Sequence, residues 1–148
     1  MLGDVKGMHI VDGYGGVGTF SLRLLRDGAA KVTLVESSPP ACADARINLR
    51  RNGFENAEVI EQAFGTVTLP KCDAMIVDPP RAGLQELGAK ALLKCSPPRV
   101  LLVSCSQQSL ARDLELLASS YRVTAMRMCD LFPHTEHVET VTMLERKT

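Results

Sequence analysis

Cys105 is the residue of this sequence with the clearest potential for covalent chemistry. It follows the apolar run RVLLVS, where a core strand is expected to end and a helix to begin. A thiolate is a strong nucleophile, and the carboxyl edge of an open α/β sheet is where such proteins bind ligands. From position alone, a merely structural role for Cys105 stays open. The other cysteines are expected to be small buried apolar residues: Cys42, Cys72, Cys95 and Cys129.

A glycine-rich segment, Asp12 to Phe20 (DGYGGVGTF), lies between an apolar run and a helical pattern. Glycines let the backbone turn sharply and approach a ligand, with a helix N-terminus behind it. Two interpretations stay open at this point, besides a tight turn without a ligand. Gly13, Gly15 and Gly18 fit the dinucleotide pattern GxGxxG, and Asp12, Gly16 and Gly18 fit the acidic-x-x-x-Gly-x-Gly loop of S-adenosylmethionine enzymes. In both, Glu36 at the end of the next apolar run accepts hydrogen bonds from ribose hydroxyls.

Asp78 is a second carboxylate at a predicted strand end, in the run Asp78-Pro79-Pro80-Arg81. The two prolines fix the turn and leave the carboxylate facing the cleft. A stiff turn without chemistry is the alternative. A dehydrogenase usually needs a second domain for its substrate, and no such domain is present in this sequence, which favours S-adenosylmethionine over a dinucleotide.

The elements that must hold these residues alternate between strands and helices. Five short apolar runs predict strands: MHIVDGYG, KVTLVES, AEVIEQ, DAMIVDPP and RVLLVSC. Their continuous apolar character is typical of strands buried on both faces of a sheet. Helical spacing is found between them, at 19–26, 40–52, 85–94 and 109–119, and Gly28 and Gly53 are predicted helix stops. This alternation predicts an α/β fold with parallel strands joined by right-handed crossovers.

The end of the chain breaks that alternation. YRVTAMRM and HVETVTMLER are two strand-like runs whose link is too short for a crossover helix, so they are expected to form an antiparallel pair. A seven-stranded, mostly parallel sheet with a C-terminal antiparallel hairpin and helices on both faces resembles the Rossmann-like fold of class I methyltransferases.

Length and composition indicate one domain, residues 1–148. The 148 residues are 45% hydrophobic and 23% charged, enough for a core and unlike a disordered chain. No apolar run approaches the roughly 20 residues that cross a bilayer, and no signal peptide is evident, so no membrane partner is expected. Five cysteines without CxxC spacing predict a reduced, cytoplasmic protein. Lys+Arg and Asp+Glu are both 17, so this domain should bind nucleic acid weakly by itself.

Together these motifs resemble the RNA uracil-C5 methyltransferases, which make 5-methyluridine in ribosomal or transfer RNA. DGYGGVGTF, DPPRAGL, VSCSQQSLARDL and CDLFPHTEHVETVTMLER occur in the family's order, and the LARD and FPHT wording is closer to the 23S ribosomal enzymes. The resemblance implies S-adenosylmethionine as cofactor and RNA as substrate. It implies that Cys105 attacks uracil C6 and that Glu139 removes the C5 proton. It further implies that Asp78 faces the cofactor and the pyrimidine. Cofactor contacts are expected at Asp12, Tyr14, Gly16, Gly18, Thr19 and Glu36.

The sequence departs from the family at three positions. Gly15 stands where the family usually has Cys, which is expected to be harmless. Ser106-Gln107 replaces Asn-Pro after the nucleophile, which is expected to loosen that loop, and Ala63 falls where a polar cofactor contact is usual. The family's upstream part is absent from this chain. It supplies RNA-binding surface, a substrate-contacting glutamine and sometimes an iron–sulfur cluster.

No metal site is expected in this chain. Cys129, His134 and His137 have a C-x4-H-x2-H spacing that matches no standard zinc motif. The leading hypothesis is a methyltransferase catalytic domain, monomeric and bound to RNA mainly through regions outside this chain. A non-catalytic S-adenosylmethionine-binding module and a nicotinamide-dependent oxidoreductase domain are the alternatives.

Overall fold

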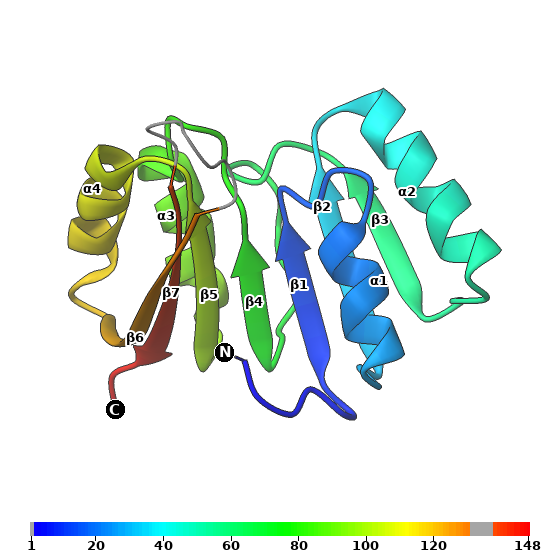
Figure 1. Cartoon of the computed structure of the whole chain (residues 1–148), viewed down its shortest axis with the longest axis horizontal. Helices are drawn as coiled ribbons and strands as arrows, with labels where there is room; N and C mark the ends of the chain where they lie inside the picture. Colours follow the sequence, from blue (N-terminus) through cyan, green and yellow to red (C-terminus); the bar gives the residue numbers. More distant parts are fainter. Residues whose placement is uncertain (1, 131–137) are drawn as a thin grey trace.

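The computed structural model describes residues 2–130 and 138–148. Within these residues, seven strands form one sheet and four helices pack on it (Figure 1). The strands are β1 (His9–Gly13), β2 (Lys31–Glu36), β3 (Ala57–Glu61), β4 (Ala74–Val77), β5 (Arg99–Ser104), β6 (Tyr121–Cys129) and β7 (Glu139–Arg146). The helices are α1 (Thr19–Arg26), α2 (Pro39–Arg51), α3 (Gln85–Cys95) and α4 (Gln107–Leu117).

The sheet is parallel through five strands and antiparallel at one end. Its order is β3-β2-β1-β4-β5-β7-β6, and β7 is antiparallel to both β5 and β6. The chain runs outward from β1 to β3 and then returns to β4 on the other side of β1. The carboxyl ends of β1 and β4 therefore flank the switch point at which open α/β sheets bind ligands. The predicted fold class, including the antiparallel closing pair, is confirmed.

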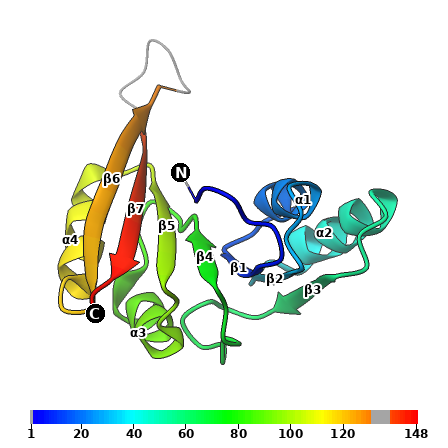
Figure 2. The same cartoon turned by 90° about the horizontal axis from the view of Figure 1, so that it is seen from below.

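Two helices cover each face of the sheet. Helices α1 and α2 lie over one face, and α3 and α4 lie over the other (Figures 1 and 2). Each face has its own core. Under α3 and α4 the core includes Val11, Val77, Leu84, Leu92, Leu102, Leu110 and Leu144. Under α1 and α2 it includes Ile10, Leu24, Leu25, Val32, Leu49 and Ile76. Alternate residues of the central strands thus enter opposite cores, as their continuous apolar sequence predicted.

The predicted helices agree closely with those observed. The first is the same, Thr19–Arg26, and Gly28 and Gly53 have positive φ after α1 and α2, as expected of helix stops. Helix α2 begins one residue earlier than predicted because proline is well accommodated in a first helical turn. Helix α4 begins two residues earlier than predicted because Ser106 caps it, accepting a hydrogen bond from the Ser109 amide.

The two edge strands are more exposed than the central strands. β3 is at one edge of the sheet, and none of its five residues is fully buried. β6 is at the other edge, and most of it is exposed. An edge strand has only one neighbour, so it lacks the cover that central strands receive. None of the described helices is long and apolar enough to cross a bilayer.

Candidate active site

The glycine loop (residues 13–18) joins the end of β1 to the start of α1, with Gly18 as the N-cap residue. Asp12 anchors this connection from within the core. One oxygen of its carboxylate accepts hydrogen bonds from the amide and hydroxyl of Ser21, at 3.0 and 2.6 Å. Burial raises the pKa of Asp12 to about 6, although the bonds from Ser21 oppose this. The structure therefore gives Asp12 a role in holding α1 to β1, and its cofactor contact stays a prediction.

Glu36 is brought to the tip of the glycine loop, as predicted for a ligand-binding carboxylate. Its Oε2 accepts a hydrogen bond from the Gly16 amide at 3.0 Å. Its Oε1 accepts from the amides of Ser37 and Ser38 at 2.7 and 2.8 Å. Three backbone donors thus fix one partly exposed carboxylate beside the loop. A carboxylate oxygen can accept about two hydrogen bonds, so Oε2, which accepts only from Gly16, can still receive a hydroxyl donor.

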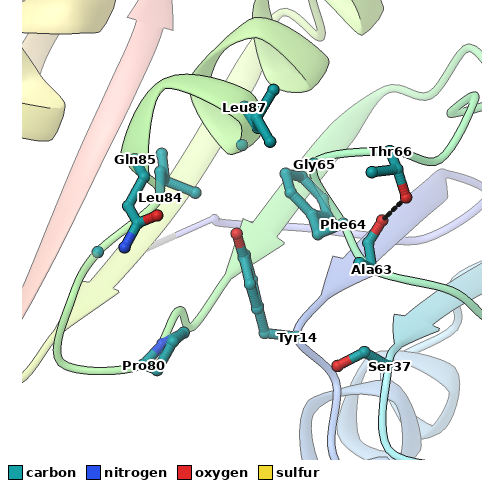
Figure 3. A pocket seen from close by; sticks show the side chains of 12 residues that line it. Tyr14, Ser37, Ala63, Phe64, Gly65, Thr66, Pro80, Leu84, Gln85 and Leu87 are labelled. Carbon is teal, nitrogen blue, oxygen red and sulfur yellow. Dashed lines mark hydrogen bonds between the residues drawn. The ribbon is translucent and has the colours of Figure 1, made fainter.

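A cleft of about 220 Å³ opens beside this loop (Figure 3). The rings of Tyr14 and Phe64 meet in its wall with centroids 4.9 Å apart and an interplanar angle of 33°. Burial raises the pKa of Tyr14 to about 12, so its phenol is neutral at physiological pH. The remaining lining residues come from the segments that follow β2 and β3, from the β4–α3 connection and from the first turn of α3: Ser37, Ala63, Gly65, Thr66, Pro80, Gly83, Leu84, Gln85, Leu87 and Gly88.

Two residues of this cleft have an uncommon backbone conformation. Tyr14 and Gln85 have φ of 61° and 57°, and they are two of the three non-glycine residues with positive φ in the part of the chain that the structure describes. Such conformations cost about 1–3 kcal/mol each and are concentrated at functional sites. Their presence in one cleft supports a ligand-binding role for it.

Sequence reasoning identified only part of this cleft. Tyr14 lines it, and Ala63 lines it at the position where the family usually has a polar contact. Gly16, Gly18 and Thr19 lie on the adjacent loop and helix start without lining it. Phe64 was missed, although its place just after a predicted strand was a usable signal. Leu84 and Leu87 were missed because only the folded β4–α3 connection brings them over the cleft.

A second group of predicted residues lies at the carboxyl edge near β5. Asp78 follows β4 and Cys105 follows the adjacent parallel strand β5. Glu139 begins β7, whose antiparallel register pairs Thr140 with Ser104. Continuing that register by one residue puts Glu139 opposite Cys105. Burial and then the charge of Glu139 raise the pKa of Asp78, so the two carboxylates lie close enough to interact.

Three serines hold the loop that carries Cys105. The Ser104 hydroxyl donates to the Ser106 carbonyl at 2.9 Å, and the Ser109 hydroxyl donates to the same oxygen at 3.1 Å. The Ser106 hydroxyl oxygen accepts from the Ser109 amide at 3.4 Å. These bonds restrain the loop at the position where the family usually has Asn-Pro. The expected loosening of this loop is therefore opposed by local hydrogen bonds, one of which uses the Ser106 side chain while the other two use its backbone carbonyl.

The remaining cysteines only partly follow the prediction. Cys42 is buried, as expected, whereas Cys129 is partly exposed. Cys72 and Cys95 are also partly exposed, and their sulfur atoms are 3.7 Å apart. Residues 2–130 and 138–148 contain no cluster of three or more potential metal ligands among His, Cys, Asp and Glu. His134, His137 and the FPHT run lie outside the described residues.

Known proteins resemble this chain in sequence over most of its length. A family model described as tRNA (uracil-5-)-methyltransferase matches residues 2–147. A Bacillus cereus protein named as an uncharacterized RNA methyltransferase is 44% identical over 145 residues. A relative from Listeria innocua with the same kind of name is 39% identical over 145 residues. In both cases the match covers 93% of this chain and 31% of the relative, so the chain spans about a third of their length.

Solved structures give the same result. The tRNA (uracil-54, C5)-methyltransferase of Pyrococcus abyssi, solved with S-adenosyl-L-homocysteine, is 38% identical with a TM-score of 0.87. That match covers 97% of this chain and 36% of the neighbour. The ribosomal protein L11 methylase of Lactobacillus delbrueckii, 16% identical with a TM-score of 0.77, shares the fold; the match covers 99% of this chain and 73% of that one. The family model matches residues 2–147, which is almost the whole of this chain, so the chain belongs to the tRNA (uracil-5-)-methyltransferase family.

Proposed function

We propose that this chain is the catalytic domain, residues 1–148, of a longer enzyme that methylates C5 of uridine in RNA. The observation that carries this proposal is the meeting of Cys105, Glu139 and Asp78 at one sheet edge, next to the cleft at the glycine loop. A nucleophile, a base and a cofactor cleft are the parts that the reaction requires. The five cysteines are free thiols, in keeping with the proposed cytoplasmic setting.

The cleft suits S-adenosylmethionine, which supplies an electrophilic methyl group when bound. Aromatic and apolar side chains of Tyr14, Phe64 and Leu84 offer contact to a flat base. The anchored carboxylate of Glu36 offers acceptors for ribose hydroxyls. The Pyrococcus abyssi relative, which was solved with S-adenosyl-L-homocysteine, supports the same cofactor for this chain.

Cys105 and Glu139 carry the proposed chemistry. Uracil C5 is a weak carbon nucleophile until a thiolate adds at C6. In that step the Cys105 sulfur bonds to C6 and the electron pair of the C5–C6 bond moves into an enolate, which makes C5 nucleophilic. After C5 is methylated, Glu139 accepts the C5 proton, the C5–C6 double bond reforms and Cys105 leaves. Asp78 follows β4 at the same edge of the sheet, within range of the charge of Glu139, and we propose that it contacts the pyrimidine and the cofactor.

The RNA substrate is proposed to be ribosomal RNA, because the LARD and FPHT segments of this sequence are more similar to the 23S ribosomal enzymes than to the transfer RNA enzymes. The matched family model and the Pyrococcus abyssi neighbour have transfer RNA in their names, so both RNAs belong in the test. A net charge of zero makes strong RNA binding by this chain alone unexpected. Most of the RNA affinity is therefore proposed to come from the rest of the longer protein.

RNA containing 5-fluorouridine tests the covalent mechanism directly. Fluorine at C5 cannot leave as a proton does, so after methylation the elimination step should stall, with the RNA still attached to Cys105. The assay uses a short RNA, ribosomal or transfer in sequence, at low salt, and mass spectrometry locates the adduct. An adduct at Cys42, Cys72, Cys95 or Cys129 would contradict the mechanism.

Two substitutions separate the roles. Cys105→Ala should give neither adduct nor methylated product. Glu139→Gln should still add and methylate, then accumulate a covalent RNA complex on ordinary uridine, since only proton removal is blocked. Methylation that survives in Cys105→Ala would rule out the covalent route.

Calorimetry with S-adenosylhomocysteine and with NAD tests the cofactor. Binding of NAD without binding of S-adenosylhomocysteine would favour the oxidoreductase alternative.

A further inference from the structure

We propose that Arg112 and Asp113 of α4 are positioning residues that hold the β4–α3 loop (residues 78–84) against the helix that follows Cys105. Arg112 donates a hydrogen bond from Nη2 to the Ala82 carbonyl at 2.7 Å. The next residue, Asp113, accepts one on Oδ2 from the Leu84 amide at 2.8 Å. The inference rests on the proposed function, because it concerns how Asp78 and Cys105 are held relative to each other.

Asp113 is a buried carboxylate whose hydrogen-bond partner belongs to the start of α3. It is only 1% exposed, and its Oδ1 has no partner in the described part of the chain. The Leu84 amide donates to its other oxygen, Oδ2. The N-cap residue of α3 is Leu84, which has no side-chain oxygen to cap the helix. Asp113 therefore supplies from α4 the cap that α3 lacks, since it accepts from one of the amides that a helix start leaves free.

The loop has two further features that bear on this contact. Gly83 has a φ of +79°, and a Cβ there would collide with the Asp113 carboxylate. A side chain at position 83 would therefore push the two segments apart. Gln85 has a φ of +57°, which is costly for a residue with a side chain. Hydrogen bonds from α4 to both sides of this turn offset that cost and keep the turn in one conformation.

The consequence for the site follows from where α4 begins. Its first residue, Gln107, is two residues after Cys105. The helix that is hydrogen-bonded to the β4–α3 loop therefore also restrains the position of Cys105. The β4–α3 loop starts at Asp78 and contributes Pro80, Gly83 and Leu84 to the cleft wall. Helix α4 thus sets the position of Cys105 relative to both Asp78 and the cleft. Small displacements between reacting groups are enough to reduce rates strongly.

Arg112 gives the cleaner test, because its side chain is exposed and its removal should leave the fold intact. The rate of Cys105 adduct formation is measured in the full 148-residue chain, with 5-fluorouridine RNA and cofactor both saturating. We expect Arg112→Ala to slow this rate about 10- to 100-fold, and Arg112→Lys to recover most of it. Arg122→Ala is the matched control, since it removes the same charge from an exposed position on the edge strand β6. It should react at the wild-type rate.

Hydrogen exchange supplies a readout that does not depend on activity. The Leu84 amide should exchange faster in Asp113→Asn and in Arg112→Ala, and the thermal unfolding midpoint of Arg112→Ala should be near that of the wild type. Unchanged exchange together with an unchanged adduct rate would overturn the inference. So would a rate that falls only at subsaturating RNA, because that result assigns Arg112 to phosphate binding. If the wild type forms no adduct and transfers no methyl group, the proposed function itself fails and the positioning role fails with it.

Discussion

Glu36 shows at the scale of one residue how the backbone prepares a carboxylate for a ligand. Three amides from two separate segments, the glycine loop and the turn after β2, converge on its two oxygens. Charge-assisted hydrogen bonds of this kind keep the side chain in one orientation before any ligand arrives. Ordering it in advance removes part of the entropic cost of binding.

Replacing Glu36 by Ala should therefore weaken binding of S-adenosylhomocysteine by about 1–3 kcal/mol, since charge-assisted hydrogen bonds to the ribose are lost. Isothermal titration calorimetry measures the change. Glu61→Ala is the control, because Glu61 is the neighbour of Glu36 in the β2–β3 register but is exposed and outside the cleft. Equal affinity in Glu36→Ala and the wild type would show that Glu36 does not bind the ribose.

Asp12 predicts a pH dependence of stability with a defined sign. Burial raises its pKa in the folded state to about 6, from 3.8. The folded protein therefore binds more protons than the unfolded chain between these values, and the contribution of Asp12 to stability falls as pH rises from about 4 through 6. The loss is on the order of 3 kcal/mol. Urea unfolding from pH 4 to 7.5 should show a flatter profile for Asp12→Asn, and parallel profiles would contradict the raised pKa.

At the scale of elements, helix α4 depends on the serines that precede it. Ser106 is an N-cap with extended backbone, and its hydroxyl oxygen accepts from the Ser109 amide. A side-chain cap satisfies one of the amides that the first helical turn leaves free. Since Cys105 is the residue before this cap, the stability of the helix start and the position of the thiol are linked.

Ser106→Ala should lower the free energy of unfolding by about 1 kcal/mol, because the cap is lost. Chemical denaturation measures it, and Ser119→Ala at the other end of α4, where the side chain is exposed, is the control. The same variant should also form the Cys105 adduct more slowly than the control. A Ser106→Ala protein as stable as Ser119→Ala would show that the cap contributes nothing.

The glycine loop is fitted to the sheet at Gly15. A Cβ at this position would lie 2.5 Å from Cγ of Leu34, a fully buried residue of β2. Gly15→Ala should destabilise the protein by about 1–3 kcal/mol through overpacking. In the double variant with Leu34→Ala, the two effects should be less than additive, because the smaller side chain makes room. Additive losses would show that the two residues do not compete for this space.

At the scale of the whole molecule, the charge balance limits how this chain meets its substrate. With 17 basic and 17 acidic residues, it has no net field to attract RNA. A plot of log association constant against log salt for a short single-stranded RNA should have a slope of about −2 or shallower, since each neutralised phosphate contributes about −0.7. Fluorescence anisotropy from low to moderate salt measures it. A slope near −5 would require about seven neutralised phosphates and would reveal a basic surface that the composition hides.

The sequence by itself determined the order and type of the elements and the strand ends at which several candidate site residues lie. Apolar runs alternating with helical spacing were enough for the parallel sheet, since buried strands must be apolar on both faces. The end-of-strand positions of Glu36, Asp78 and Cys105 followed from the same pattern. Glu139 was identified only through the family resemblance, because a carboxylate at the start of a strand has no distinguishing local signal.

Only the tertiary structure decided which residues from distant parts of the sequence contact one another and which of them line the cleft. The cleft walls formed by Phe64, Leu84 and Leu87 depend on how the β4–α3 connection folds over the glycine loop. The hydrogen bond from the Leu84 amide to Asp113 joins residues that are 29 positions apart in the sequence. Local spacing reports on which face of an element a residue occupies, but it carries no information on which other element covers that face. That is decided by packing of the whole chain, and at this sheet edge packing brings Cys105, Glu139 and Asp78 together.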